Sequence, residues 1–166
     1  MSLLRLDLIS ASPEQTQAWG AVLGELAQPG DVYALVGDLG SGKTCLVQGI
    51  GRGLGVLEAI HSPTFVLANE HKSGRLPLYH VDVYRVTSAA EAVGFGLEDY
   101  VNGEGVCVIE WAEKIREALP PERLKIVLRH LGESTRGLRF EGQGERYEVL
   151  LIEFERRIRL GDATRN

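Results

Sequence analysis

Eight consecutive residues have the types and the spacing of a phosphate-binding loop. The segment Gly37-Asp38-Leu39-Gly40-Ser41-Gly42-Lys43-Thr44 matches the pattern G-x-x-x-x-G-K-[S/T]. Its glycines let the chain wrap so that backbone N–H groups of residues 38–44 point inward at phosphate oxygens. Lys43 supplies a positive charge to the outer phosphates, and Thr44 supplies a hydroxyl to Mg²⁺. The segment therefore predicts that the protein binds a nucleoside triphosphate with Mg²⁺.

Two carboxylates are candidates for the remaining chemistry. Glu110 directly follows the apolar run Val106–Ile109, and Asp82 lies in the strand-like segment Tyr79–Tyr84. Either carboxylate could bind Mg²⁺ through water while the other orients the attacking water. The alternative for each is a salt bridge at the end of a strand. We predict Lys43, Asp82 and Glu110 as the catalytic residues.

The choice of nucleotide is indicated by two motifs that the sequence lacks. GTPases read guanine with an Asn-Lys-x-Asp motif, and they use an Asp-x-x-Gly switch. Neither spacing occurs in the chain. We therefore predict ATP as the nucleotide.

The elements around the loop indicate an α/β protein. The apolar run Val32–Val36 predicts a strand covered on both faces, and a helix carrying Leu46, Val47 and Ile50 follows the loop. Later residues predict a hairpin, a second buried strand and further alternating strands. The remaining predicted helices fall at residues 13–26, 88–93, 112–119 and 146–158.

Composition limits the classes of function. A chain of 166 residues with 44% hydrophobic residues predicts one globular domain over residues 1–166. The net charge of −5 argues against a strongly basic nucleic-acid-binding protein. Acidic residues outnumber basic ones in residues 1–120, whereas basic residues slightly outnumber acidic ones in residues 121–166. The last third is thus either a contact for an acidic partner or, more simply, a solvated mixed-charge tail.

The chain shows no sign of membrane insertion or export. No apolar stretch is long enough to span a bilayer, and the N-terminus lacks the uncharged core of a signal peptide. Cys45 and Cys107 fall inside predicted elements, which favours buried, reduced thiols over a disulfide. We therefore predict a cytoplasmic protein without a membrane partner.

Four segments, in this order, resemble the TsaE family, the bacterial P-loop ATPases of tRNA threonylcarbamoyladenosine biosynthesis. They are Gly37–Thr44, Ser62-Pro63-Thr64-Phe65, Tyr79–Arg85 and Ile109-Glu110-Trp111-Ala112-Glu113-Lys114. The resemblance covers roughly residues 5–141, and its most specific parts are the Ser-Pro-Thr-Phe and Ile-Glu-Trp segments. One departure is Asn69-Glu70-His71, near which the family often has a tyrosine.

The resemblance implies a fold, a reaction and partners. The expected fold is a P-loop NTPase-like three-layer sandwich with a mixed parallel and antiparallel sheet. The expected function is hydrolysis of ATP with Mg²⁺, as a subunit that drives or resets a TsaB–TsaD heterodimer. TsaD transfers the threonylcarbamoyl group to the tRNA adenosine, so the tRNA is contacted only indirectly, through the complex.

The resemblance also assigns roles to residues. Lys43 grips phosphate, Thr44 and Glu110 serve Mg²⁺, and Asp82 is the candidate base or water-orienting group. Thr64 is expected to act as a switch residue near the γ-phosphate. The nucleotide-contacting residues are then Asp38, Leu39, Gly40, Ser41, Gly42, Lys43, Thr44, Thr64 and Arg136.

The sequence leaves several roles open. Trp111 could line the nucleotide or partner surface or belong to the core. For Arg85 an ion pair is favoured over stabilisation of the transition state, and for His80 an orienting or packed role is favoured over metal ligation. Two other functions compete with the ATPase: a small-molecule kinase, with Arg136 or Arg139 as a lid arginine, and a non-catalytic nucleotide switch.

Overall fold

One seven-stranded sheet organises the chain. The computed structural model describes residues 3–63 and 67–164, with side chains described up to residue 161. The strand order is β1-β7-β6-β2-β5-β4-β3. β2 pairs in parallel with β5 and β6, and β4 pairs in parallel with β5, whereas the β1–β7, β6–β7 and β3–β4 pairs are antiparallel. The elements are β1 (Leu3–Ser10), α1 (Pro13–Leu26), β2 (Val32–Val36), α2 (Lys43–Leu54), β3 (Ala68–His71), β4 (Leu78–Asp82), α3 (Ala89–Gly94), α4 (Leu97–Val101), β5 (Val106–Glu110), the 3₁₀ helix η1 (Ala112–Ala118), β6 (Arg123–His130), β7 (Arg136–Gln143) and α5 (Glu145–Thr164).

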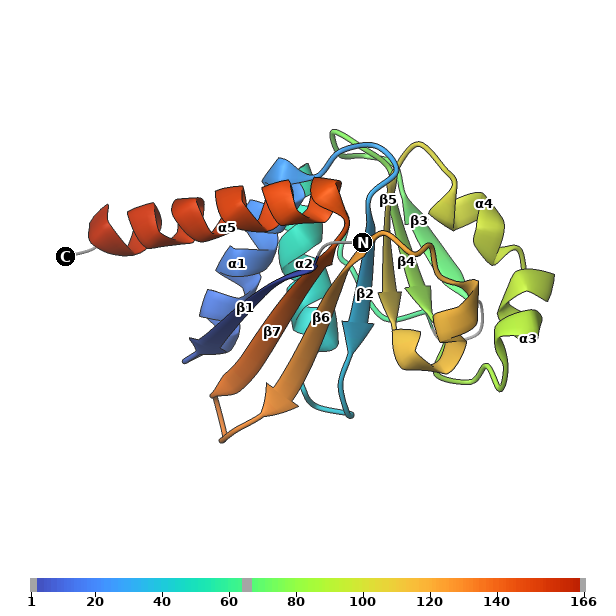
Figure 1. The fold of residues 1–166 in the computed structure, drawn as a ribbon, viewed down its shortest axis with the longest axis horizontal. Coiled ribbons are helices and arrows are strands. Elements are labelled where there is room, and N and C mark those ends of the chain that lie inside the picture. The colour runs from blue at the N-terminus through green and yellow to red at the C-terminus, as the bar shows by residue number, and fades with distance from the viewer. Residues whose placement is uncertain (1–2, 64–66, 165–166) are drawn as a thin grey trace.

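Helices cover the sheet in two groups, which gives three layers (Figure 1). α1, α2 and α5 form one hydrophobic core with the sheet, which includes Leu23, Leu46 and Phe154. α3, α4 and η1 form a second core on the other face, which includes Val81 and Ile109. The predicted α/β sandwich with a mixed sheet is thereby confirmed.

The helices predicted at residues 13–26, 88–93 and 112–119 are present within one residue of those bounds, whereas the helix predicted at 146–158 continues to Thr164 as α5. In α1 the Ser12 hydroxyl accepts the backbone N–H of Gln15 at 3.1 Å and so caps the helix. The helix α4 is not among the predicted elements; it has only five residues and starts after Gly96 at φ +92°. Both cysteines are free thiols, as the sequence predicts. Cys107 is buried as expected, but Cys45 is only partly buried.

The helices α1 and α2 cross at unusually close range because both have glycines at the contact. Gly20 and Gly24 of α1 face α2, and Gly49 and Gly53 of α2 face α1. A Cβ added at any of these positions would lie between 2.0 and 2.6 Å from a backbone carbonyl oxygen of the other helix. The close crossing fixes α2, whose first turn carries Lys43 and Thr44, against the rest of the fold.

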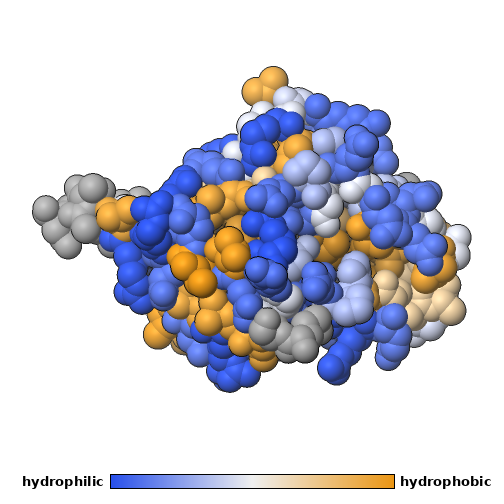
Figure 2. Space-filling view, turned by 45° about the horizontal axis from the view of Figure 1, so that its top comes forward, coloured by the Kyte–Doolittle hydropathy of each residue, from blue (hydrophilic) through white to orange (hydrophobic). Residues whose placement is uncertain are grey.

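The helix α5 extends from the sheet to one side of the molecule (Figure 1). Its inner residues, such as Phe154, belong to the core, while Val149, Ile152 and Leu160 are exposed. Hydrophobic residues lie among hydrophilic ones near the base of this projection (Figure 2). Within the described part of the chain, every helix is too short or too polar to cross a membrane.

Candidate functional site

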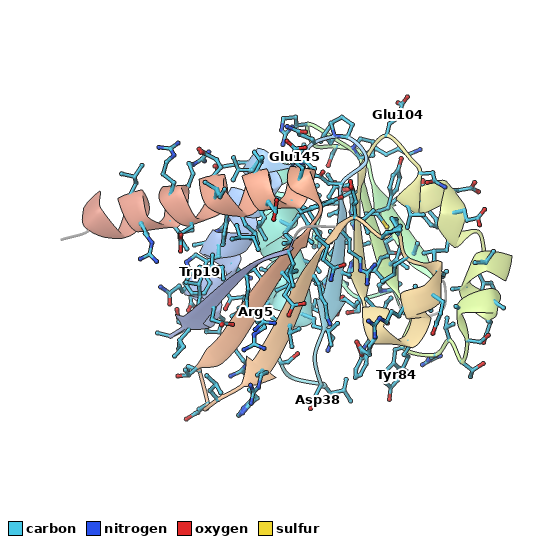
Figure 3. The ribbon with its side chains drawn as sticks, in the orientation of Figure 1. Arg5, Trp19, Asp38, Tyr84, Glu104 and Glu145 are labelled. Carbon is cyan, nitrogen blue, oxygen red and sulfur yellow. The ribbon has the colours of Figure 1, made fainter. Side chains whose placement is uncertain are left out.

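The loop between β2 and α2 has the backbone shape that its glycines predict. Gly40 and Gly42 have φ values of +78° and +101°, which lie in the left-handed region that side chains disfavour. Gly42 is also the N-cap of α2, so the loop runs directly into the positive end of the helix. Asp38 in this loop and Tyr84 after β4 lie beyond the carboxyl ends of the parallel strands, and Glu104 lies at the opposite end of the sheet (Figure 3).

Lys43 is buried beneath the loop. Its Nζ donates to the carbonyl oxygen of Asp38 at 2.9 Å and, over a shorter distance, to that of Gly37. The ammonium also lies 4.2 Å from the centre of the Trp111 ring, within the range of a cation–π interaction. Burial lowers the pKa of Lys43, and the Glu110 carboxylate opposes that shift. A phosphate oxygen can replace either carbonyl as an acceptor, because an ammonium group donates up to three hydrogen bonds.

Thr44 and Glu110 come together although 66 residues separate them. The Thr44 hydroxyl is 3.2 Å and 3.4 Å from the two oxygens of Glu110, and it is 2.9 Å from the Ser62 hydroxyl. These groups and the loop line a cavity of about 280 Å³ that also includes Asp82 and Trp111. The structure therefore brings residues 39–44 of the loop together with Asp82 and Glu110 around one cavity.

Asp82 lies directly beside Glu110, because the two residues are register partners on the parallel strands β4 and β5. One oxygen of Asp82 accepts the backbone N–H of Tyr84 at 2.9 Å. Burial raises the pKa of Asp82; the bond from Tyr84 opposes the shift, and the nearby Glu110 carboxylate adds to it. Two carboxylates at adjacent strand ends form a site of concentrated negative charge that attracts a cation.

The oxygen donors at this cavity suit Mg²⁺. A hydroxyl and carboxylates are hard ligands, and Mg²⁺ in phosphate-binding sites takes one or two protein ligands together with waters and phosphate oxygens. Across the described residues, no group of three or more histidine, cysteine, aspartate or glutamate side chains has the arrangement of a metal cage. The groups at this cavity that could hold Mg²⁺ are the Thr44 hydroxyl and the Glu110 carboxylate, with Asp82 on the adjacent strand.

The sequence also singles out Arg136, Arg85 and Thr64, and the structure places only the first of them close to the loop. Arg136 begins β7 close to the loop, with its Cγ 3.9 Å from where a Cβ on Gly42 would be. Its Nη1 donates to the carbonyls of Gly132 and Thr135, so this nitrogen serves the β6–β7 turn. Arg85, for which the sequence favours an ion pair, is exposed and has none among the described residues. Thr64 lies outside the described residues.

Three other residues contribute to the site, although the sequence assigns a definite role to none of them. Ser62 reaches the Thr44 hydroxyl, and its only sequence signal is its place beside a proline in the Ser-Pro-Thr-Phe segment. Trp111 lies over Lys43 and is the one described non-glycine residue with a positive φ, 62°. Its backbone turns sharply there, between the end of β5 and the start of η1. His80 is fully buried and contacts Glu110, in line with an orienting or packed role.

A groove of about 790 Å³ adjoins the loop cavity and shares Leu39, Ser62, Asp82 and Trp111 with it. Apolar and aromatic side chains line much of the groove, and Phe95 on its wall is 63% exposed. The groove thus opens next to the carboxylates, on the side of β4 and α3.

Comparison with known proteins now identifies the family. The family model described as threonylcarbamoyl adenosine biosynthesis protein TsaE matches residues 10–138. The chain belongs to the TsaE family. A Bacillus subtilis relative, named tRNA threonylcarbamoyladenosine biosynthesis protein TsaE, is 45% identical over 147 residues, which are 89% of this chain and 92% of the relative.

Other TsaE relatives and a solved structure agree with the assignment. A protein of the same name from Treponema pallidum is 45% identical over 128 residues, covering 77% of this chain and 94% of its own. A crystal structure of Bacillus subtilis YdiB superposes with a TM-score of 0.83 at 40% identity, covering 95% of this chain and 98% of that one. The TsaE family match ends before α5, so this helix lies beyond the matched segment.

Proposed function

We propose that this protein is a Mg²⁺-dependent ATPase of tRNA threonylcarbamoyladenosine biosynthesis that works with a TsaB–TsaD heterodimer in the cytoplasm. The observation that carries the proposal is the meeting of Thr44 and Glu110 at the phosphate loop, with Asp82 on the adjacent strand. Membership of the TsaE family supports the pathway. Contact with the tRNA is expected only through the partners, since the overall charge of −5 does not favour phosphate backbones.

The residues divide the work as follows. Amides of residues 38–44 and the Lys43 ammonium bind the phosphates and stabilise charge that develops during hydrolysis. Thr44 and Glu110 hold Mg²⁺, which when bound neutralises charge on the phosphate oxygens. Asp82 orients the attacking water, because one of its oxygens is committed to the Tyr84 N–H and Glu110 is the carboxylate within reach of Thr44.

The test is steady-state ATP hydrolysis with and without TsaB–TsaD, for the wild type and Lys43→Ala. We expect turnover that depends on Mg²⁺ and changes when the partners are added. Loss of one charge-stabilising group commonly lowers turnover by about 100-fold, so Lys43→Ala should lower it by at least about tenfold. Partners that neither bind the protein nor alter its turnover would contradict the pathway assignment while leaving the ATPase intact. Turnover unchanged in Lys43→Ala would contradict the ATPase site itself.

The groove favours a second candidate, phosphoryl transfer to a small-molecule acceptor, because a kinase needs an acceptor site beside the γ-phosphate. A panel of metabolites with radiolabelled ATP separates the two. The label appears as free phosphate if water is the acceptor, and on a metabolite if the protein is a kinase. The nucleotide-switch alternative requires partner binding that depends on the nucleotide and survives both Glu110→Gln and Asp82→Asn, with no measurable turnover.

A further inference from the structure

His80 is a buried polar residue whose hydrogen bonding is directed at a single group. It lies in the centre of β4 and is fully buried. Its Nε2 is 2.5 Å from Oε2 of Glu110, a side chain that is itself only 3% exposed. Its other ring nitrogen, Nδ1, has no hydrogen-bond partner in the described part of the protein.

A purely packing role does not account for this arrangement. An apolar side chain of similar volume would fill the same space without leaving a buried nitrogen unpaired, and unpaired buried polar atoms are unfavourable. The ring nitrogen that is paired faces a carboxylate, whose oxygens accept hydrogen bonds, so we place the hydrogen on Nε2, which donates it to Glu110. The free-energy cost of the unpaired Nδ1 is thus accepted in exchange for one contact, between Nε2 and the carboxylate of Glu110, which lies next to Thr44.

The contact restricts how Glu110 can present its oxygens. Oε2 is held by His80, and Oε1 lies nearer to the Thr44 hydroxyl, at 3.2 Å. Without the histidine, the carboxylate could rotate toward Lys43, whose ammonium it attracts. Outer groups that orient a metal ligand in this way commonly affect metal affinity by about 10- to 100-fold.

We infer that His80 is a positioning residue: by donating from Nε2 to Oε2 it fixes the Glu110 carboxylate so that Oε1 stays beside the Thr44 hydroxyl, where the two side chains would hold Mg²⁺. This inference rests on the proposed Mg²⁺–nucleotide site. It concerns the orientation of a ligand, and His80 itself touches neither the nucleotide nor the metal.

Two amide substitutions that differ by one methylene group separate the nitrogens of the ring. In His80→Gln the side-chain amide nitrogen reaches the position of Nε2, whereas in His80→Asn it reaches only that of Nδ1. The readout is binding of Mn²⁺, as a substitute for Mg²⁺, in the presence of the non-hydrolysable analogue AMP-PNP, followed by the free-Mn²⁺ electron paramagnetic resonance signal. AMP-PNP affinity in EDTA is measured in parallel.

We expect the Gln variant to bind Mn²⁺ within about threefold of the wild type and the Asn variant to bind it at least about tenfold more weakly. AMP-PNP affinity without metal should be equal in all three proteins. His80→Leu, which fills the space without a donor, should show the same loss, so the inference stays testable if the Asn variant does not fold. In a Glu110→Gln background, His80→Asn should cause no additional loss, because the carboxylate that it positions is gone.

Equal Mn²⁺ affinity in the Gln and Asn variants would overturn the positioning role. A further loss from His80→Asn in the Glu110→Gln background would overturn it as well. A wild-type protein that binds AMP-PNP but no Mn²⁺ would instead refute the proposed metal site, and this inference would fail with it. The two failures are therefore distinguished by the wild-type titration.

Discussion

The charge of Asp82 destabilises the ligand-free fold, and its replacement by asparagine is expected to make the protein more stable while abolishing ATP hydrolysis. The aspartate is partly buried beside Glu110, and both effects raise its pKa. A group whose charged form is disfavoured in the folded state destabilises that state whenever it is ionised. The asparagine of the variant keeps an oxygen that accepts the Tyr84 N–H, so the turn after β4 is preserved.

The magnitude follows from the geometry of the two strands. Neighbouring strands lie about 4.8 Å apart, so the carboxylates of Asp82 and Glu110 are on the order of 6 Å from each other. At an effective dielectric constant of about 20, two like charges at that distance repel by roughly 3 kcal/mol. Solvent at the partly exposed Asp82 screens much of this, and Lys43 offsets another part, which leaves a gain of about 1 kcal/mol.

The pH dependence gives the prediction its sign. Because the pKa of Asp82 is raised in the folded state, its penalty is fully present above that raised pKa. The penalty disappears as the pH falls to the ordinary aspartate value of about 3.9. The advantage of Asp82→Asn should therefore be largest near neutral pH and decrease steadily as the pH is lowered toward about 4.

The assay is equilibrium urea unfolding followed by circular dichroism, without nucleotide or Mg²⁺, because bound ligand would stabilise the wild type selectively. Glu104→Gln is the matched control: it removes an exposed carboxylate at the opposite end of the sheet, and a change within about 0.5 kcal/mol is expected. An Asp82→Asn protein that is less stable than the wild type at neutral pH would refute the reasoning. An advantage that grows as the pH falls would refute it too.

Two further pairs of substitutions, each a test with its control, probe the fold that holds the site. Gly49→Ala places a Cβ 2.3 Å from a carbonyl oxygen of α1 and should lower the free energy of unfolding, measured in urea, by about 2 kcal/mol or more. Gly94→Ala is the control: its Cβ meets open space, so the free energy of unfolding should change by less than about 1 kcal/mol. Arg146→Met leaves the buried Asp31 without the arginine that contacts both of its oxygens at 3.0 and 2.7 Å, and should cost about 3 kcal/mol in the same assay. Arg5 is exposed and only 3.6 Å from its partner Glu141, so Arg5→Met should cost less than about 1 kcal/mol. Equal losses within either pair would contradict the burial argument.

The sequence predicts which residues belong to the site better than it predicts which of them lie next to each other. The phosphate loop, the strand before it and the helix after it all follow from local patterns, and each is present. Which carboxylate would lie by Thr44 depends on the strand order, in which β5 and not β4 pairs with β2, a long-range contact with no local signal. The register of β4 with β5 explains why Asp82 and Glu110 are neighbours, which the sequence left open.

Short elements and single side chains are the parts that the sequence misses. The five residues of α4 are too few for a periodic pattern to appear. Ser62 belongs to no regular element, and it reaches the site only because the chain after α2 returns past Thr44. The exposed state of Arg85 is likewise decided by what lies around it in space, and no neighbouring residue in the sequence indicates it.

The glycines show why a residue type alone is an incomplete signal. At Gly40 and Gly42 the requirement is conformational, since φ is positive and the loop must present its amides. At Gly49 and Gly53 the backbone is ordinary helix, and the requirement is the absence of a side chain against α1. The sequence contains the same letter for both, and the second requirement becomes visible only when the facing helix is in place. Some of the 20 glycines of the chain therefore serve helix packing and not loops, and that packing holds the helix on which Lys43 and Thr44 depend.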